Sequence, residues 1–184
     1  AGVDIITPDI ARPWHENGAI VNEVNFGPLL GGGDISRRHL PEYLDRLLGG
    51  GDGRVPVEVF VGGDAAWQAA QERWQRLRSA GPGVHLSDAA RTLDGEGTDI
   101  PMDLRGVYHR TRALVLSREV HALVLVVRSD ELLYTGLPLE WVDSVTHVDR
   151  ALVSERDPAG PLPETHAAAL ERLFAGWTKP HRRH

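Results

Sequence analysis

The sequence feature that most constrains the fold is the apolar run at residues 121–127, His-Ala-Leu-Val-Leu-Val-Val. It carries aliphatic and β-branched side chains on both faces, without the polar alternation of a half-exposed strand. Such a run is typical of a central strand in a parallel sheet that is covered on both sides. We therefore expect an α/β fold built around this segment.

The segment before this strand predicts the opening of a βαβ unit. Residues 55–61 are expected to form a buried strand, and residues 65–79 a helix with Trp67 and Trp74 on one apolar face. The turn between them reads Gly62-Gly63-Asp64. Such a turn is compatible with a nucleotide site, but glycine turns are common in βαβ units, and we prefer the structural interpretation. Further elements are expected at residues 105–117 (helix), 142–148 (strand) and 164–177 (helix).

Residues 49–53, Gly-Gly-Gly-Asp-Gly, have the composition of a flexible linker. We expect it to divide the chain into an N-terminal part (1–48), a linker (49–54), a central domain (55–157) and a terminal helix with a basic tail (158–184). Ahead of the linker, a helix is expected at residues 39–48, with Ser36 as its cap. The chain opens on Ala1 within a strand-like segment, so we expect it to be the C-terminal part of a longer protein.

Two strands are predicted in the N-terminal part, at residues 3–6 and 19–24. Glu23 and Asn25 are two residues apart, so both side chains point to one face of the second strand. Asp4 adds a third oxygen if the two strands pair. Carboxylate and amide oxygens together suit Mg²⁺. The alternative is that these side chains are simply solvated polar groups on a hairpin.

Composition excludes several classes of function. The formal net charge of −6 argues against a nucleic-acid-binding surface, and the absence of cysteine excludes disulfides and thiolate chemistry. No apolar run approaches the roughly 20 residues that a membrane helix needs. No signal peptide is visible, so we expect a cytoplasmic protein. The histidines are scattered without a metal-ligand spacing, and the acidic pair Asp130-Glu131 is expected to be solvated in a loop.

The opening stretch resembles the C-terminal end of ATP-grasp ligases, and most closely the cyanophycin synthetase family. The matching motifs are Gly-Val-Asp at residues 2–4, Thr-Pro-Asp-Ile at residues 7–10, and Asn-Glu-Val-Asn at residues 22–25, with Pro28 after them. One departure is Leu29, where the family usually has glycine. The resemblance implies that Asp4, Glu23 and Asn25 hold Mg²⁺ ions that bridge ATP phosphates, with Asn25 also belonging to the ATP site.

The rest of the chain resembles the Mur-ligase-like domain that follows the ATP-grasp module in this family, in a degenerate form. The family's phosphate loop, Gly-Thr-Asn-Gly-Lys-Thr, corresponds here to residues 62–67, with Ala66 at the lysine position and Trp67 at the hydroxyl position. Spacing back from Gly136-Leu137 puts Val126 where the family has a metal-coordinating Glu. Backbone amides alone could still form an anion nest at the loop.

Taken with the resemblance, the expected architecture is α/β: the end of an ATP-grasp fold plus a truncated P-loop or Mur-ligase-like βαβ domain. The expected function is that of a C-terminal fragment of an ATP-dependent carbon–nitrogen ligase. ATP and an amino acid or peptide would be the substrates, and Mg²⁺ would be the cofactor. We expect the protein to catalyse at most one ligation reaction. The alternative is a non-catalytic scaffold or homo-oligomerisation module beside a ligase core. A nucleotide-binding regulatory domain is a third interpretation, against which Ala66 argues.

Overall fold

The computed structural model of the 184-residue chain describes residues 2–27, 31–49, 51–79 and 81–178. The chain forms two compact units, an N-terminal unit of residues 1–53 and a C-terminal unit of residues 54–184. The division falls within the glycine-rich segment. Each unit is described by itself. No helix of the described residues is long and apolar enough to cross a membrane.

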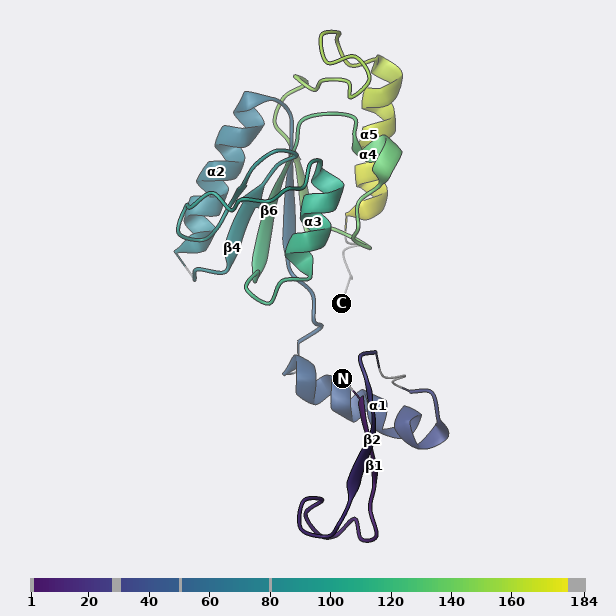
Figure 1. The fold of residues 1–184 in the computed structure, drawn as a ribbon. Helices are drawn as coiled ribbons and strands as arrows, with labels where there is room; N and C mark the ends of the chain where they lie inside the picture. Colours follow the sequence, from purple (N-terminus) through teal and green to yellow (C-terminus); the bar gives the residue numbers. More distant parts are fainter. Residues whose placement is uncertain (1, 28–30, 50, 80, 179–184) are drawn as a thin grey trace, which may run out of the picture. The chain divides into compact units, whose positions relative to one another are not determined.

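The N-terminal unit contains an antiparallel pair of strands and one helix (Figure 1). The strands are β1 (Gly2–Ile6) and β2 (Ile20–Asn25), and the helix is α1 (Asp34–Leu48). Helix α1 begins earlier than expected, because Gly33 is its N-cap and Ser36 lies inside the first turn. The Ser36 hydroxyl accepts a hydrogen bond from the Gly33 N–H at 3.2 Å, so it satisfies a donor at the helix start without being the cap residue.

The connection between β1 and β2 is closed by Asn17. Its side-chain amide donates hydrogen bonds to Thr7 Oγ1 at 2.8 Å and to the Asp9 carbonyl at 2.6 Å. These bonds tie the two ends of the long loop together, as a tight turn would do in a shorter hairpin. The described part of the N-terminal unit has no buried residue, so its order comes from backbone pairing and these loop contacts.

The C-terminal unit is an α/β domain with a five-stranded sheet in the order β5-β4-β6-β3-β7. Strands β4, β6, β3 and β7 are parallel, and the short β5 runs antiparallel to β4 at one edge. The predicted central strand is confirmed, because β6 lies between β4 and β3. The strand bounds are β3 (Val57–Val61), β4 (Val84–Ser87), β5 (Thr92–Leu93), β6 (Ala122–Val127) and β7 (Ser144–His147).

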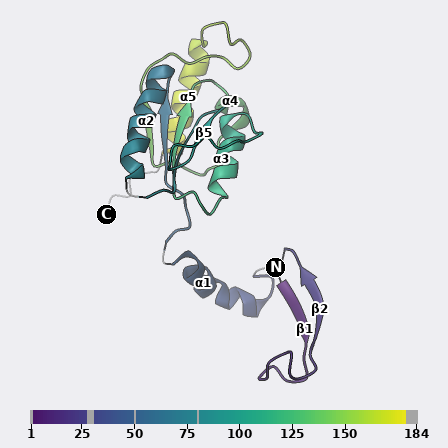
Figure 2. The ribbon, with the colours of Figure 1, turned by 60° about the vertical axis from the view of Figure 1, so that its left-hand side comes forward.

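Helices cover both faces of this sheet (Figure 1), and Figure 2 shows the same layers after a rotation. Helix α2 lies on one face, and three helices lie on the other. Alternate residues of the central strands supply the two cores: Phe60 and Val126 face α2, whereas Val59 and Leu125 face the opposite layer. The helix bounds are α2 (Asp64–Arg78), α3 (Val107–Val115), α4 (Leu132–Thr135) and α5 (Glu164–Trp177).

Helix α5 has the predicted bounds and is part of the C-terminal core. Leu170 and Phe174 are each 1% exposed and pack into the cluster that contains the central strands. The Phe174 ring also makes edge contacts with His147 and Trp177, at centroid distances of 5.9 and 6.1 Å. Residues 164–178 therefore belong to the sheet domain. The predicted basic tail at residues 179–184 lies outside the described residues.

Candidate functional site

The hairpin of the N-terminal unit places Asp4 directly opposite Glu23. Residues that face each other in an antiparallel pair have Cβ atoms about 4.5–5.5 Å apart, and like charges in this position repel. Both side chains are exposed. A cation held between the two carboxylates would replace this repulsion with two attractions.

Asn25 lies on the same face as this pair, two residues beyond Glu23 along β2. Its partner across the hairpin is Gly2, which has no side chain. Within the described residues, the side chains of Asp4, Glu23 and Asn25 have no hydrogen-bond or ion-pair partner. The three predicted ligands therefore share one face, with their oxygens free.

A β-bulge lies immediately beside this group. The register shifts after the Asp4–Glu23 pair, so that Ile5 pairs with Val21 and Asn22 is the extra residue. Bulges increase the local twist and commonly re-aim side chains next to functional sites.

The donor set of two carboxylates and one amide oxygen fits a partly hydrated Mg²⁺, which usually keeps several of its waters. No group of three or more His, Cys, Asp or Glu that could hold a metal occurs among the described residues, and this set has only two carboxylates.

In the C-terminal unit, both glycine N–H groups of the turn between β3 and α2 are hydrogen-bonded within the domain. Only Gly62 and Gly63 separate the strand from the helix. The Gly62 N–H donates to the Val127 carbonyl at 3.0 Å, and the Gly63 N–H donates to Asp149 Oδ1 at 2.9 Å. The same carboxylate oxygen accepts the Ala151 N–H at 2.7 Å. The Asp149 carboxylate thus lies beside the start of α2 and accepts one N–H group there, where negative charge is favoured.

The close approach of this carboxylate explains the glycine at position 62. Its φ of 144° lies in the region that favours glycine, and a Cβ there would be 2.7 Å from Asp149 Oδ1. The two glycines therefore serve the packing of the segment after β7 against the turn. This geometry supports the structural interpretation of the Gly62-Gly63-Asp64 turn.

A second internal carboxylate fills the N-terminus of α3. Glu131 Oε2 accepts the Val107 N–H at 2.8 Å, and Oε1 accepts the Tyr108 N–H at 3.1 Å. The prediction that Asp130 and Glu131 are solvated is wrong, since they are 0% and 8% exposed. They are buried because each carboxylate satisfies donors from distant segments, which adjacency in the sequence does not reveal.

The positions at which the family has a lysine and a glutamate are part of the apolar core. Ala66 on α2 and Val126 on β6 are both 0% exposed and belong to the cluster between α2 and the sheet. Trp67 is partly buried against the same cluster. An ammonium or carboxylate at these positions would be buried without a partner, which is costly. The local packing is therefore that of an ordinary helix on a sheet.

Asp130 is the centre of a polar cluster near the carboxyl edge of the sheet. It accepts the Glu155 N–H at 2.7 Å, contacts His166 Nδ1 at 2.7 Å, and accepts the Ser154 hydroxyl at 3.3 Å. Burial alone would raise the pKa of Asp130, but the hydrogen bonds from Glu155, His166 and Ser154 outweigh it and leave this pKa below its usual value. The cluster joins the segment after β6 to the first turn of α5.

We expect Asp130→Asn to lower the free energy of unfolding near pH 7 by about 1–3 kcal/mol, because buried donors lose a charged acceptor. The pKa of Asp130 is lowered in the folded state, so its stabilisation is present above the unfolded pKa of about 3.9 and is lost as the pH falls through and below that value. The variant should therefore lose less stability than the wild type on acidification. Urea unfolding between about pH 7 and pH 2.5 measures both effects. The exposed Asp157→Asn is the matched control, and equal pH profiles for wild type and Asp130→Asn would contradict the assignment.

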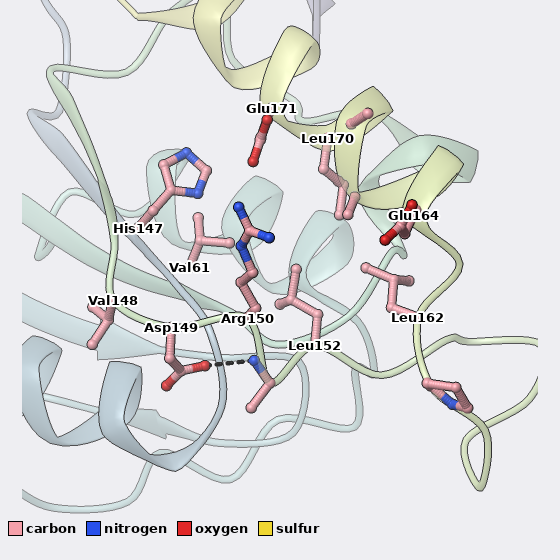
Figure 3. Close-up of a pocket in the computed structure, with 14 residues that line it drawn as sticks. Val61, His147, Val148, Asp149, Arg150, Leu152, Leu162, Glu164, Leu170 and Glu171 are labelled. Carbon is pink, nitrogen blue, oxygen red and sulfur yellow. Dashed lines mark hydrogen bonds between the residues drawn. The ribbon is translucent and has the colours of Figure 1, made fainter.

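A pocket of about 900 Å³ lies at the carboxyl ends of β3 and β7, against α5 (Figure 3). Strand β3 leads into α2 on one face of the sheet, whereas its neighbours β6 and β7 lead to helices on the other face. Open α/β sheets bind ligands outside the carboxyl ends of strands where the connections diverge in this way. Sequence reasoning missed this pocket. Its residues come from the loop after β7 and the first turns of α5, and neither segment carries a recognisable motif.

Comparison with known proteins adds no assignment: no family model matches the chain, and no curated protein matches its sequence.

Proposed function

We propose that the N-terminal hairpin supplies Mg²⁺ ligands to an ATP-dependent carboxylate–amine ligase of the ATP-grasp type. The observation that carries the proposal is the pairing of Asp4 with Glu23, with Asn25 on the same face. All three side chains lack a hydrogen-bond or ion-pair partner among the described residues. The motif resemblance at residues 2–4, 7–10 and 22–25 supports the ATP-grasp type. On this proposal the chain is the C-terminal fragment of the ligase.

In such a ligase, ATP phosphorylates a substrate carboxylate, which gives an acyl phosphate and ADP. An amine then attacks the acyl carbon, the new carbon–nitrogen bond forms, and phosphate leaves. When bound, Mg²⁺ offsets negative charge on the phosphates during transfer. Asp4 and Glu23 would hold the cation by charge, and Asn25 would add a neutral oxygen ligand. The substrates implied by the resemblance are an amino acid or peptide.

The C-terminal unit is proposed to add no second nucleotide site, which limits the protein to one ligation reaction. Asp149 and Glu131 support this, because each places a carboxylate of the domain at a helix N-terminus. The same observation favours the second candidate function, in which this unit is a non-catalytic scaffold or oligomerisation module. The two candidates differ only in whether the hairpin takes part in catalysis.

The cation site is tested by titrating the chain with Mn²⁺, as a paramagnetic substitute for Mg²⁺, and following free Mn²⁺ by electron paramagnetic resonance. We expect Asp4→Asn and Glu23→Gln each to weaken binding by about tenfold or more, since each removes half of the carboxylate charge. Glu16→Gln is the matched control, because Glu16 is an exposed glutamate of the same unit outside the hairpin strands. Binding that is unchanged in both hairpin variants would refute the site.

A further inference from the structure

The pocket beside β3, β7 and α5 has an aliphatic interior. Val61 from the end of β3, Leu152 and Leu162 from the segment before α5, and Leu170 from α5 form this part of its lining. Two of them, Val61 and Leu170, are 1% exposed and belong to the domain core, so the interior is rigidly supported. A volume of about 900 Å³ lies at the upper end of the range of small-molecule sites.

The rim of the same pocket carries charges of both signs. Arg150 extends into the middle of the pocket from the loop after β7, and Glu171 and Glu164 project from α5 (Figure 3). Within the described part of the chain, none of these three side chains forms an ion pair or a side-chain hydrogen bond. Unpaired charges that converge on an aliphatic cavity are the polar groups that fix ligand orientation in small-molecule sites.

The charge distribution disfavours phosphorylated ligands. One backbone donor of the lining, the Ala151 N–H, is occupied by the Asp149 carboxylate, which also accepts the Gly63 N–H. Glu164 and Glu171 would repel a phosphate. Among the described lining residues, Arg150 is the only side chain with a permanent positive charge. A ligand that pairs with both signs must carry a cationic and an anionic group together, as the ammonium and carboxylate of an amino acid do.

We propose that this pocket binds a zwitterionic amino acid or short peptide with aliphatic side chains. The ligand carboxylate pairs with Arg150, the ammonium pairs with Glu171, and the side chains lie on Val61, Leu152, Leu162 and Leu170. Guanidinium–carboxylate pairing provides both charge and geometric specificity. The site lies within the C-terminal unit and does not depend on the cation-binding hairpin, so either proposal can fail without the other.

The experiment uses the full chain and the dipeptide leucyl-leucine as the probe, with binding measured by isothermal titration calorimetry. We expect a dissociation constant of about 1 mM or lower. Arg150→Gln and Glu171→Gln should each weaken binding by about tenfold or more, because each leaves a ligand charge without its partner. Arg172→Gln, an exposed arginine of α5 outside the pocket lining, should bind as the wild type does.

Derivatives of the probe separate the two charge contacts. N-acetylated leucyl-leucine lacks the ammonium and should be insensitive to Glu171→Gln, whereas the C-terminal amide lacks the carboxylate and should be insensitive to Arg150→Gln. Amide chemical-shift changes on adding leucyl-leucine should centre on Leu152, Ala167 and Ala168. No binding of leucyl-leucine, equal binding by the wild type and both pocket variants, shift changes centred elsewhere, or tighter binding of inorganic phosphate at the pocket would overturn the proposal.

Discussion

Replacing Phe174 with alanine is expected to lower the free energy of unfolding of the C-terminal unit by about 3–5 kcal/mol. Phe174 is 1% exposed, lies in the core between α5 and the sheet, and has edge contacts with His147 and Trp177. Alanine would lose this buried surface and leave a cavity that the surrounding strands can fill only partly. A loss of this size is comparable with the total stability of many domains.

Urea unfolding of the full chain, followed by tryptophan fluorescence and circular dichroism, measures this effect. Leu116→Ala is the control, because Leu116 is 76% exposed and its removal should change the free energy of unfolding by less than about 0.5 kcal/mol. A Phe174→Ala variant that loses less than about 1 kcal/mol would mean that α5 is not an integral layer of the domain. The wall that α5 gives to the pocket would then be lost as well.

The main elements of the C-terminal unit were predictable because their patterns are strong. The apolar run around β6 identified the central strand, and helical periodicity identified α2 and α5. Strands β4 and β5 were not resolved from the sequence. Strand β4 is short and buried on both faces, and β5 has only two residues. Neither strand therefore shows the alternation of apolar and polar residues by which a strand is recognised in a sequence. Helix α4 was missed for the same reason, since it spans only Leu132–Thr135.

The start of α1 was predicted too late for a different reason. A serine near a helix start suggests the N-cap, but here Gly33 has the extended backbone of the cap and Ser36 occupies the first turn. The side chain of Ser36 reaches back to the Gly33 N–H. This arrangement differs from a helix capped by serine only in the backbone conformation of the residues at the helix start. That conformation cannot be deduced from the identity of the residues.

The candidate hairpin site was predictable in part. Alternation along a strand places Glu23 and Asn25 on one face, but the position of Asp4 depends on the register between strands. That register is set by the Asn17 loop contacts and by the bulge at Asn22, neither of which the pattern reveals. The roles of Asp149 and Glu131 depend on partners at Gly63 and Val107, far away in the sequence. Pairings between residues so far apart in the sequence can be identified only from the three-dimensional structure.

The two units therefore have different chemical characters. The hairpin of the N-terminal unit carries three oxygen-bearing side chains that have no partner among the described residues. In the C-terminal unit, the carboxylates of Asp149 and Glu131 accept N–H groups at helix starts. Phosphoryl chemistry is proposed for the first, and recognition of a zwitterion for the second.

Glu23→Gln provides the largest functional effect that the proposed ligase predicts. The substitution keeps the size of the side chain and removes the charge that faces Asp4 across the hairpin. We expect Mg²⁺-dependent ATP turnover by the full-length protein to fall by about 100-fold or more, since even residues that only support a metal ligand change affinity or activity by about 10- to 100-fold. Glu16→Gln should retain turnover within about twofold, as expected for an exposed residue outside the site.

The most direct test of the central claim is therefore the release of ADP from Mg²⁺-ATP by the full-length protein and its Glu23→Gln variant, with equal folding verified by circular dichroism. The proposed ligase predicts that turnover is lost in Glu23→Gln and retained in Glu16→Gln. Turnover by Glu23→Gln at the wild-type rate would contradict the assignment of this hairpin to the catalytic Mg²⁺ site.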